Sequence, residues 1–283
     1  MAQILNGSLV TAAINEKTRA EAERLRAAGI VPTLAILRVG DRADDISYEK
    51  NAMKRCALAG VEVRNVVLPA GVSQEELMAA LDELNRDDSV HGIIYFRPLP
   101  PHLDDEALRH ALSPEKDVDG VTDTSLAGVF SGSGAGFAPC TAQACIEILD
   151  HFGIEICGRR AVVIGRSLVV GKPAAMLLTN RSATVTVCHT RTRGAPEITR
   201  RADIVIVAAG RAETIGGEYF STGQTVIDVG TNWSAEKGRL CGDVRFDEAE
   251  PIVGAITPVP GGVGTVTTSV LVSHVVEAAK RRA

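Results

Sequence analysis

The stretch Ala161-Val162-Val163-Ile164-Gly165-Arg166-Ser167-Leu168-Val169-Val170-Gly171 decides the fold of this chain. It begins with a short apolar run typical of a buried strand, continues directly into Gly165, and is followed after Gly171 by a helical pattern. A strand, a glycine turn and a helix in this order form the phosphate-binding element of dinucleotide-binding α/β domains. The spacing departs from G-x-G-x-x-G, because Ser167 stands where the second glycine would be. We expect Gly165, Arg166 and Ser167 to bind a dinucleotide cofactor.

The next strand pattern ends in His189-Thr190-Arg191, where the choice between NAD and NADP is usually made. A site that selects NAD normally has Asp or Glu there to bind the ribose 2′-hydroxyl. No acid is present at this point, and Arg166, Arg191 and Arg193 lie near the two strand ends. Guanidinium groups pair well with a 2′-phosphate, so we expect NADP, bound in part by Thr190 and Arg191. The alternative is that these arginines are simply solvated.

A second glycine turn, Thr257-Pro258-Val259-Pro260-Gly261-Gly262-Val263-Gly264, precedes a helical pattern at 266–279. Proline fixes φ and glycine allows close approach of the backbone, so this turn is typical of a rigid, ligand-facing helix N-terminus. The alternative is an ordinary loop with a helix cap. Together the two turns predict the phosphate side and the nicotinamide side of one dinucleotide site.

Composition narrows the class of protein. A chain of 283 residues with 45% hydrophobic and 23% charged residues has room for about two globular domains. Its net charge of −5 argues against a nucleic-acid or membrane-surface binder. The six cysteines and six histidines are dispersed without a C-x-x-C pair, so we expect reduced thiols and no metal. No signal peptide or membrane-spanning stretch is recognised, and we expect a cytoplasmic protein.

Strand and helix patterns alternate along both halves of the chain. Apolar runs predict strands at 33–39, 61–68, 92–96, 160–164, 184–188, 203–209 and 225–229. Helical spacing predicts intervening helices, among them 8–28, 44–59 and a helix capped by Ser73 with Glu76. Such alternation implies βαβ units and parallel sheets, hence an α/β protein of two domains. Ser131-Gly132-Ser133-Gly134-Ala135-Gly136 is either the linker or a surface loop of the first domain.

At this point the chain resembles the methylenetetrahydrofolate dehydrogenase/cyclohydrolase (FolD) family. The matching stretches are 162–167 with 170–173, Asp228-Val229-Gly230, Gly242-Asp243-Val244, 257–264, Lys116-Asp117-Val118-Asp119-Gly120 and Pro139-Cys140-Thr141. The resemblance implies a folate-binding domain over 1–139, onto which the C-terminal helix 265–283 packs, a Rossmann-type NAD(P)-binding domain over 140–264, and a cleft between them. It also implies a folate-type substrate, a homodimer, and contacts from Thr231 and Gly262 to the cofactor.

The departures from the family pattern fall in the folate pocket. The family's Tyr-x-x-x-Lys places its tyrosine on Tyr48 but its catalytic lysine on Ala52, and its pocket glutamine on Phe96. Lys50 and Lys54 flank the lost lysine, yet at about 100° per residue they point about 160° and 120° away from the Tyr48 side of the helix. The resemblance implies that Asp119 binds the pterin N–H donors and that Tyr48 lines the same pocket.

These departures affect two reactions differently. Oxidation of 5,10-methylenetetrahydrofolate moves a hydride to the nicotinamide, and the protein mainly supplies orientation and shielding from water. Hydrolysis of the methenyl product needs an activated water and a positioned acid or base, which is worth about 10²–10⁴ in rate. We therefore expect an NADP-dependent dehydrogenase whose cyclohydrolase activity is weak or absent. Two alternatives stay open, namely a paralogue acting on a different one-carbon carrier and a non-catalytic nucleotide-binding subunit.

Overall fold

The computed structural model describes residues 1–234 and 237–283 and divides into two compact units. Unit 1 contains residues 1–12 and 141–267, and unit 2 contains residues 13–140 and 268–283. The N-terminus differs from the expected organisation, which placed all of 1–139 in one domain. Residues 1–12 belong to unit 1 because strand β1 (Gln3–Ile4) pairs in parallel with β11 (Ala255–Ile256), a contact between the two ends of the chain that no local pattern encodes.

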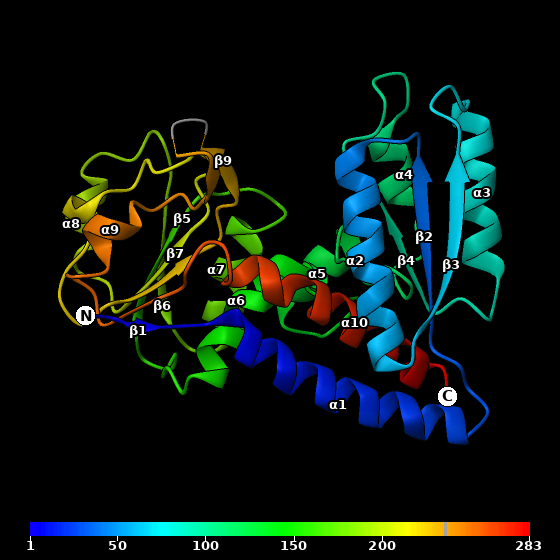
Figure 1. Cartoon of the computed structure of the whole chain (residues 1–283), viewed down its shortest axis with the longest axis horizontal. Helices are drawn as coiled ribbons and strands as arrows, with labels where there is room; N and C mark the ends of the chain where they lie inside the picture. Colours follow the sequence, from blue (N-terminus) through cyan, green and yellow to red (C-terminus); the bar gives the residue numbers. More distant parts are fainter. Residues whose placement is uncertain (235–236) are drawn as a thin grey trace. The chain divides into compact units, whose positions relative to one another are not determined.

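Unit 1 is built on a six-stranded parallel sheet in the order β1-β11-β8-β7-β5-β6. Figure 1 labels β1, β5, β6 and β7 of this sheet. Its remaining strands are β5 (Arg160–Ile164), β6 (Thr184–Cys188), β7 (Ile204–Val207) and β8 (Thr225–Asp228). These four strands confirm the apolar runs predicted for the second half of the chain. The first strand of the series, β5, lies between β6 and β7, so the strand order reverses there. In open α/β sheets a ligand binds outside the carboxyl ends of the strands at such a point.

The helices of unit 1 are α6 (Cys140–His151), α7 (Gly171–Asn180), α8 (Ala195–Thr199) and α9 (Phe246–Ala249), with a 3₁₀ turn at Gly217–Tyr219. An antiparallel hairpin of β9 (Asn232–Ser234) and β10 (Arg239–Cys241) was not predicted. Its strands have only three residues each, too few for a periodicity to be recognised.

Unit 2 holds a three-stranded parallel sheet in the order β3-β2-β4. The strands are β2 (Thr33–Val39), β3 (Glu62–Leu68) and β4 (Gly92–Tyr95), and the helices are α2 (Ala43–Ala59), α3 (Gln74–Arg86), α4 (Asp105–Ala111) and α5 (Asp123–Ser131). Leu81 of α3 and Leu108 of α4 pack with Leu37 and Ile93 of the sheet in one buried core. The predicted capping box is present, with Ser73 and Glu76 bonding each other's backbone N–H groups.

Two long helices belong partly to each unit, α1 (Gly7–Ala27) and α10 (Val263–Arg281). The glycine-rich stretch 131–136 is a loop within unit 2 and not the linker between the units. It lies against α5, because a Cβ on Gly136 would lie 2.3 Å from Ser125 Oγ. The surface-loop alternative is therefore the correct one.

A buried ion pair fixes α2 against its sheet. Arg38 on β2 is 8% exposed, and its Nε donates to Glu49 Oε2 of α2 at 2.7 Å. A second donor of Arg38 bonds Asp41 Oδ1 at 2.9 Å, and Asn65 of β3 donates to Glu49 Oε1 at 3.2 Å. Because Glu49 directly follows Tyr48 in the helix, this contact fixes the rotation of the helix that carries Tyr48.

We predict that Glu49→Ala lowers the free energy of unfolding by about 2–4 kcal/mol, since it leaves the Arg38 guanidinium buried with Asp41 as its remaining carboxylate partner. The matched control is Glu62→Ala, which removes a solvent-exposed partner of Arg26 at 3.2 Å and should change stability by about 1 kcal/mol or less. Urea unfolding of the three proteins makes the comparison. Equal effects of the two substitutions on the free energy of unfolding would contradict a stabilising role for the buried Arg38–Glu49 ion pair.

Candidate active site

The glycine loop between β5 and α7 has the strand–turn–helix context that the sequence predicts. Gly165 has φ +127°, and a Cβ there would lie 2.2 Å from the Ala208 carbonyl oxygen. A Cβ on Gly171 would lie 2.3 Å from the Gly165 oxygen, so both positions require glycine. Ser167, at the non-glycine position of the motif, accepts hydrogen bonds on Oγ from the Val170 and Gly171 N–H groups at 3.1 and 3.4 Å. The serine thus organises the N-terminus of α7, where an anion is favoured.

The arginines named from the sequence gather at one edge of the sheet. Ile164 and Cys188 are paired at the ends of β5 and β6, so Arg166 and Arg191 follow neighbouring strand ends. Arg166, Arg191 and Arg193 are exposed, and no carboxylate of residues 1–234 or 237–283 lies within ion-pair distance of them. Thr190 lies between the same strand end and Arg191. Uncompensated guanidinium groups at this edge suit a phosphate.

Two buried aspartates, Asp228 and Asp243, hold the loops that follow strands β7 and β8. Both belong to the stretches that resemble the FolD family. Asp228, 3% exposed at the end of β8, accepts from the N–H groups of Gly230, Asp243 and Val244 at 2.9, 3.1 and 3.0 Å. A Cβ on Gly242 would lie 1.8 Å from Asp228 Oδ2, which explains the glycine before Asp243.

Asp243 is fully buried and connects two further segments. Its carboxylate accepts from the Gly210 and Arg211 N–H groups at 2.8 and 3.0 Å and from Asn232 Nδ2 at 2.9 Å. The loops after β7 and β8 are therefore held by one carboxylate. The stretch Gly242-Asp243-Val244 matches the family's sequence, but the sequence does not indicate that Asp243 has a structural role.

The second glycine turn lies beside these loops. The Asp228 N–H donates to Thr257 Oγ1 at 2.7 Å, which ties the start of the turn to the end of β8. Thr231 Oγ1 lies 3.7 Å from where a Cβ on Gly264 would be. A Cβ on Gly262 would lie 2.5 Å from the Pro258 oxygen, so Gly262 is required by the packing of the turn itself. The structure thus places Thr231 beside the turn that contains Gly262.

The folate-pocket residues named from the sequence gather in unit 2. The Tyr48 and Phe96 rings contact edge to face, with centroids 5.5 Å apart and planes at 82°. Ala52, one turn after Tyr48 on α2, is fully buried, whereas Lys50 and Lys54 are exposed. Burial, reinforced by the nearby Asp119, raises the pKa of Tyr48, and the Thr268 hydroxyl of α10 opposes that rise. Thr268 was not identified from the sequence, because α10 is separated from α2 by most of the chain.

Asp119 is the carboxyl group near Tyr48, and its pKa is strongly shifted. Burial, followed by the charge of Asp117, raises its pKa to about 7, while contacts with Cys140 and the charge of Arg97 act in the opposite direction. Such a pKa means that the carboxyl changes its charge near neutral pH. A carboxylate here can accept hydrogen bonds from N–H donors of a ligand.

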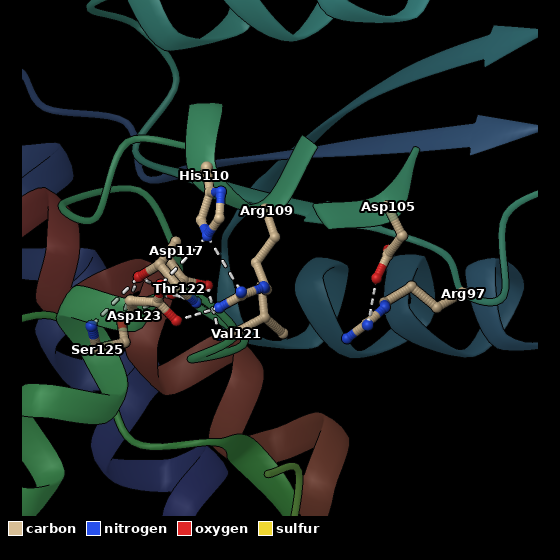
Figure 2. Close-up of polar contacts among 9 residues, drawn as sticks. All are labelled: Arg97, Asp105, Arg109, His110, Asp117, Val121, Thr122, Asp123 and Ser125. Atoms are coloured by element: carbon tan, nitrogen blue, oxygen red, sulfur yellow. Dashed lines mark hydrogen bonds and ion pairs between the residues drawn. The ribbon is translucent and has the colours of Figure 1, made fainter. Parts of the chain in front are cut away.

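The neighbouring Asp117 has a structural role, which Figure 2 shows. It is fully buried, and its carboxylate accepts from the N–H groups of Val121 and Thr122 at 3.0 and 2.8 Å and from the hydroxyls of Thr122 and Ser125, both at 2.7 Å. These four bonds fix the turn that carries Asp119 to the start of α5.

Arg97 is already paired with a carboxylate. Its guanidinium donates to Asp105 at the start of α4, and the two side chains point toward each other in Figure 2. A separate contact group links Arg109 and His110 at the end of α4 with Asp123 of α5. The charge of Arg97 opposes the rise in the pKa of Asp119.

The described residues contain no cluster of three or more His, Cys, Asp or Glu arranged to hold a metal ion. Nor does any helix in the part of the chain that is described combine the length and apolarity needed to cross a membrane.

Comparison with known proteins covers both units. The model of the tetrahydrofolate dehydrogenase/cyclohydrolase catalytic domain matches residues 5–119, and that of the family's NAD(P)-binding domain matches residues 139–283. Bifunctional protein FolD 1 of Desulfitobacterium hafniense (strain Y51) is 49% identical over 280 residues, covering 99% of each chain. Bifunctional protein FolD of Carboxydothermus hydrogenoformans is 48% identical over 279 residues, covering 98% of this chain and 97% of its own.

Solved structures agree over the whole length. The bifunctional FolD enzyme of Campylobacter jejuni superposes with a TM-score of 0.96 at 37% identity, covering 100% of both chains. The Trypanosoma brucei FolD enzyme, solved with NADP and an inhibitor, gives a TM-score of 0.91 at 39% identity over 99% of this chain and 98% of that one. These likenesses extend to both units.

Proposed function

Since the chain belongs to the tetrahydrofolate dehydrogenase/cyclohydrolase family, we propose that it oxidises 5,10-methylenetetrahydrofolate to the methenyl compound with NADP and hydrolyses that product weakly or not at all. The observation that carries this proposal is the apolar contact in the pocket. Ala52 is fully buried and Phe96 packs edge to face on Tyr48, where the family's pattern has a lysine and a glutamine.

The residues of unit 1 fit NADP. Gly165 and Gly171 allow close approach of the backbone, and Ser167 shapes the helix start that favours a pyrophosphate. Arg166, Arg191 and Arg193 would hold the 2′-phosphate, and Thr190 would contribute a hydroxyl. Thr231 and Gly262 would contact the nicotinamide side. When bound, the cofactor supplies one chemical function here, acceptance of a hydride.

The residues of unit 2 fit a folate. We assign to the Asp119 carboxylate the binding of the pterin N–H donors and to Tyr48 one wall of the pocket. The Tyr48–Phe96 pair excludes water from its own contact surface, which favours hydride loss over hydration. The oxidation needs no proton transfer from the protein, so the absence of a lysine at position 52 leaves this step intact.

Hydrolysis of the methenyl compound lacks the lysine and the glutamine that the family's pattern places in the pocket. Among the residues that surround Asp119, Cys140 is a buried thiol whose pKa burial raises well above its usual range, and burial likewise raises the pKa of Tyr48. Asp119 itself is assigned to the pterin. No further acid or base in the described residues is assigned to the pocket, so a water at the methenyl carbon has no partner for its proton.

A second substrate is compatible with one observation. The aromatic pair makes the pocket more apolar than the family's pattern, as a paralogue acting on a different one-carbon carrier would need.

The intact glycine turn at 257–264 argues against a non-catalytic nucleotide-binding subunit. From the family resemblance and the net charge of −5, we further propose a cytoplasmic homodimer that binds neither nucleic acid nor membrane.

We predict a preference for NADP over NAD. Replacing Arg166 or Arg191 by Ala should lower kcat/KM with NADP about 10- to 100-fold, because one charge-assisted contact to the 2′-phosphate is worth about 1.5–3 kcal/mol. The same variants should leave kcat/KM with NAD nearly unchanged. Arg159→Ala, which removes an exposed partner of Glu155, is the matched control. Equal efficiency of the unmodified protein with both cofactors would rule out the assignment.

We predict that the protein oxidises the methylene bridge but does not accelerate hydrolysis of methenyltetrahydrofolate. Absorbance of the methenyl compound is followed with and without enzyme, in a buffer where spontaneous hydrolysis is slow. Ala52→Lys combined with Phe96→Gln should recover hydrolysis, whereas each single substitution should not. Hydrolysis by the unmodified protein at the rate of hydride transfer would contradict the proposal. Failure of both reactions would favour the different-carrier alternative.

We predict that tetrahydrofolate binding weakens below neutral pH. The pKa of Asp119 is raised to about 7, so its carboxylate is the main form above pH 7 and is lost as the pH falls through that value. If the ionised form accepts the pterin N–H bonds, Kd should rise about tenfold per pH unit below 7. Asp119→Asn should bind more weakly and independently of pH between 5.5 and 8. Titration calorimetry measures both, and a flat profile in the unmodified protein would falsify the assignment.

A further inference from the structure

We infer that His274 of α10 is a positioning residue for this reaction: it holds the peptide group before Asp119 and thereby fixes where the Asp119 carboxylate points. The inference rests on the proposed function, in which Asp119 binds the pterin. Neither the motifs nor the departures from the family pattern single out this histidine.

The Val118 carbonyl is the point that His274 holds. His274 Nδ1 donates to this oxygen at 2.9 Å, and the Cys140 thiol donates to it at 3.2 Å. The two donors lie 3.7 Å apart. Because the peptide group is planar, fixing the Val118 carbonyl also fixes the plane that ends at the Cα of Asp119. The direction of the Asp119 side chain then depends on few remaining rotations.

The imidazole of His274 is a neutral donor. Burial, with a smaller contribution from the charge of Arg281, lowers the pKa of His274 to about 4, and the bond to the Val118 carbonyl opposes this shift. The other charged groups near the ring are Glu277 on its own helix and Asp117 on the loop. Since a carbonyl oxygen only accepts, the proton of the neutral ring must be on Nδ1.

The ring itself is held in place. It lies against Phe137 with centroids 4.9 Å apart and planes at 34°, and the Arg281 guanidinium covers Phe137 at 4.3 Å. The Phe137 N–H donates to Ser125 Oγ at 3.3 Å, and that hydroxyl donates to Asp117 at 2.7 Å. These contacts run from His274 back to the loop that carries Asp119, so the histidine and the loop form one closed network.

The backbone on the other side of Asp119 is closely packed. Gly120, directly after Asp119, has φ +72°, and a Cβ there would lie 2.5 Å from Pro139 N and 2.6 Å from the Phe137 oxygen. Without the imidazole, the Val118 carbonyl would keep only the thiol, which is a weak donor. The peptide could then rotate, and the Asp119 carboxylate would lose its alignment with the pterin.

The test compares His274→Leu with His274→Asn. The Asn amide nitrogen is as many bonds from Cα as His Nδ1, so it can restore the donor, while Leu fills similar space without one. Titration calorimetry with tetrahydrofolate should show Kd about five- to tenfold higher for the Leu variant, the effect of one lost hydrogen bond. The Asn variant should bind within about twofold of the unmodified protein. NADP affinity should be unchanged in both variants, and His110→Leu, at an exposed histidine of α4, is the matched control.

A double-mutant cycle separates positioning from general damage. If His274 acts through Asp119, His274→Leu should cause no further loss of affinity in the Asp119→Asn background. Its effect on Tm should be the same in both backgrounds. Should the Leu variant fail to fold, His274→Gln, whose amide is one bond too long, replaces it.

Three results would overturn the inference. The first is equal Kd for the Leu and Asn variants, and the second is an equal loss of affinity with and without the Asp119 carboxylate. In both cases tetrahydrofolate binding by the unmodified protein would leave the proposed function standing. The third is absence of tetrahydrofolate binding by the unmodified protein, which would overturn the proposed function and the inference together.

Discussion

Buried carboxylates that accept N–H and O–H groups hold the loops of this protein. Asp117, Asp228 and Asp243 are 0%, 3% and 0% exposed. Asp117 accepts hydrogen bonds from the turn that follows it, and Asp228 and Asp243 each accept them from two segments of the chain. A buried charge is tolerated only where such bonds satisfy it, so the carboxylate and the loop conformation determine each other. This explains the glycines beside them, since a Cβ on Gly242 would lie 1.8 Å from Asp228 Oδ2. The turns can then present backbone and side-chain groups to a ligand without reorganising.

Asp119 differs from these three because burial and its neighbours raise its pKa to about 7. Its neighbours are the carboxylate of Asp117, the thiol of Cys140 and the guanidinium of Arg97. Arg97 already bonds Asp105. The loop around it is rigid, yet the carboxyl titrates near neutral pH. A fixed backbone that carries a carboxyl with a strongly perturbed pKa is the combination expected of a ligand-binding group.

Much of the architecture follows from local sequence. Buried strands such as 160–164 and 225–229 are visible as apolar runs, and Gly165 and Ser73 mark turns and caps by their chemistry. The contacts that finish the site join residues far apart in the chain. β1 pairs with β11, and His274 bonds Val118 across 156 positions, so no window of sequence contains both partners. The site residues could be named from motifs, but the groups that orient them could not, because a buried histidine on an apolar helix has no distinguishing spacing.

The two altered pocket positions form one physical change. Tyr48 and Ala52 are four residues apart on α2 and share a face, and Phe96 covers that face at Tyr48. A lysine at position 52 would start from a fully buried position, where an ammonium group is tolerated only with a polar partner. A glutamine at position 96 would likewise need a partner for its amide. We therefore expect the two polar residues of the family's pattern to depend on each other. Under the proposed function, Ala52 and Phe96 leave an apolar surface beside Tyr48, which would suit hydride removal and would leave a hydrolytic water without the lysine and the glutamine of the family's pattern. Retention of the dehydrogenase activity and loss of the cyclohydrolase activity would then have the same cause.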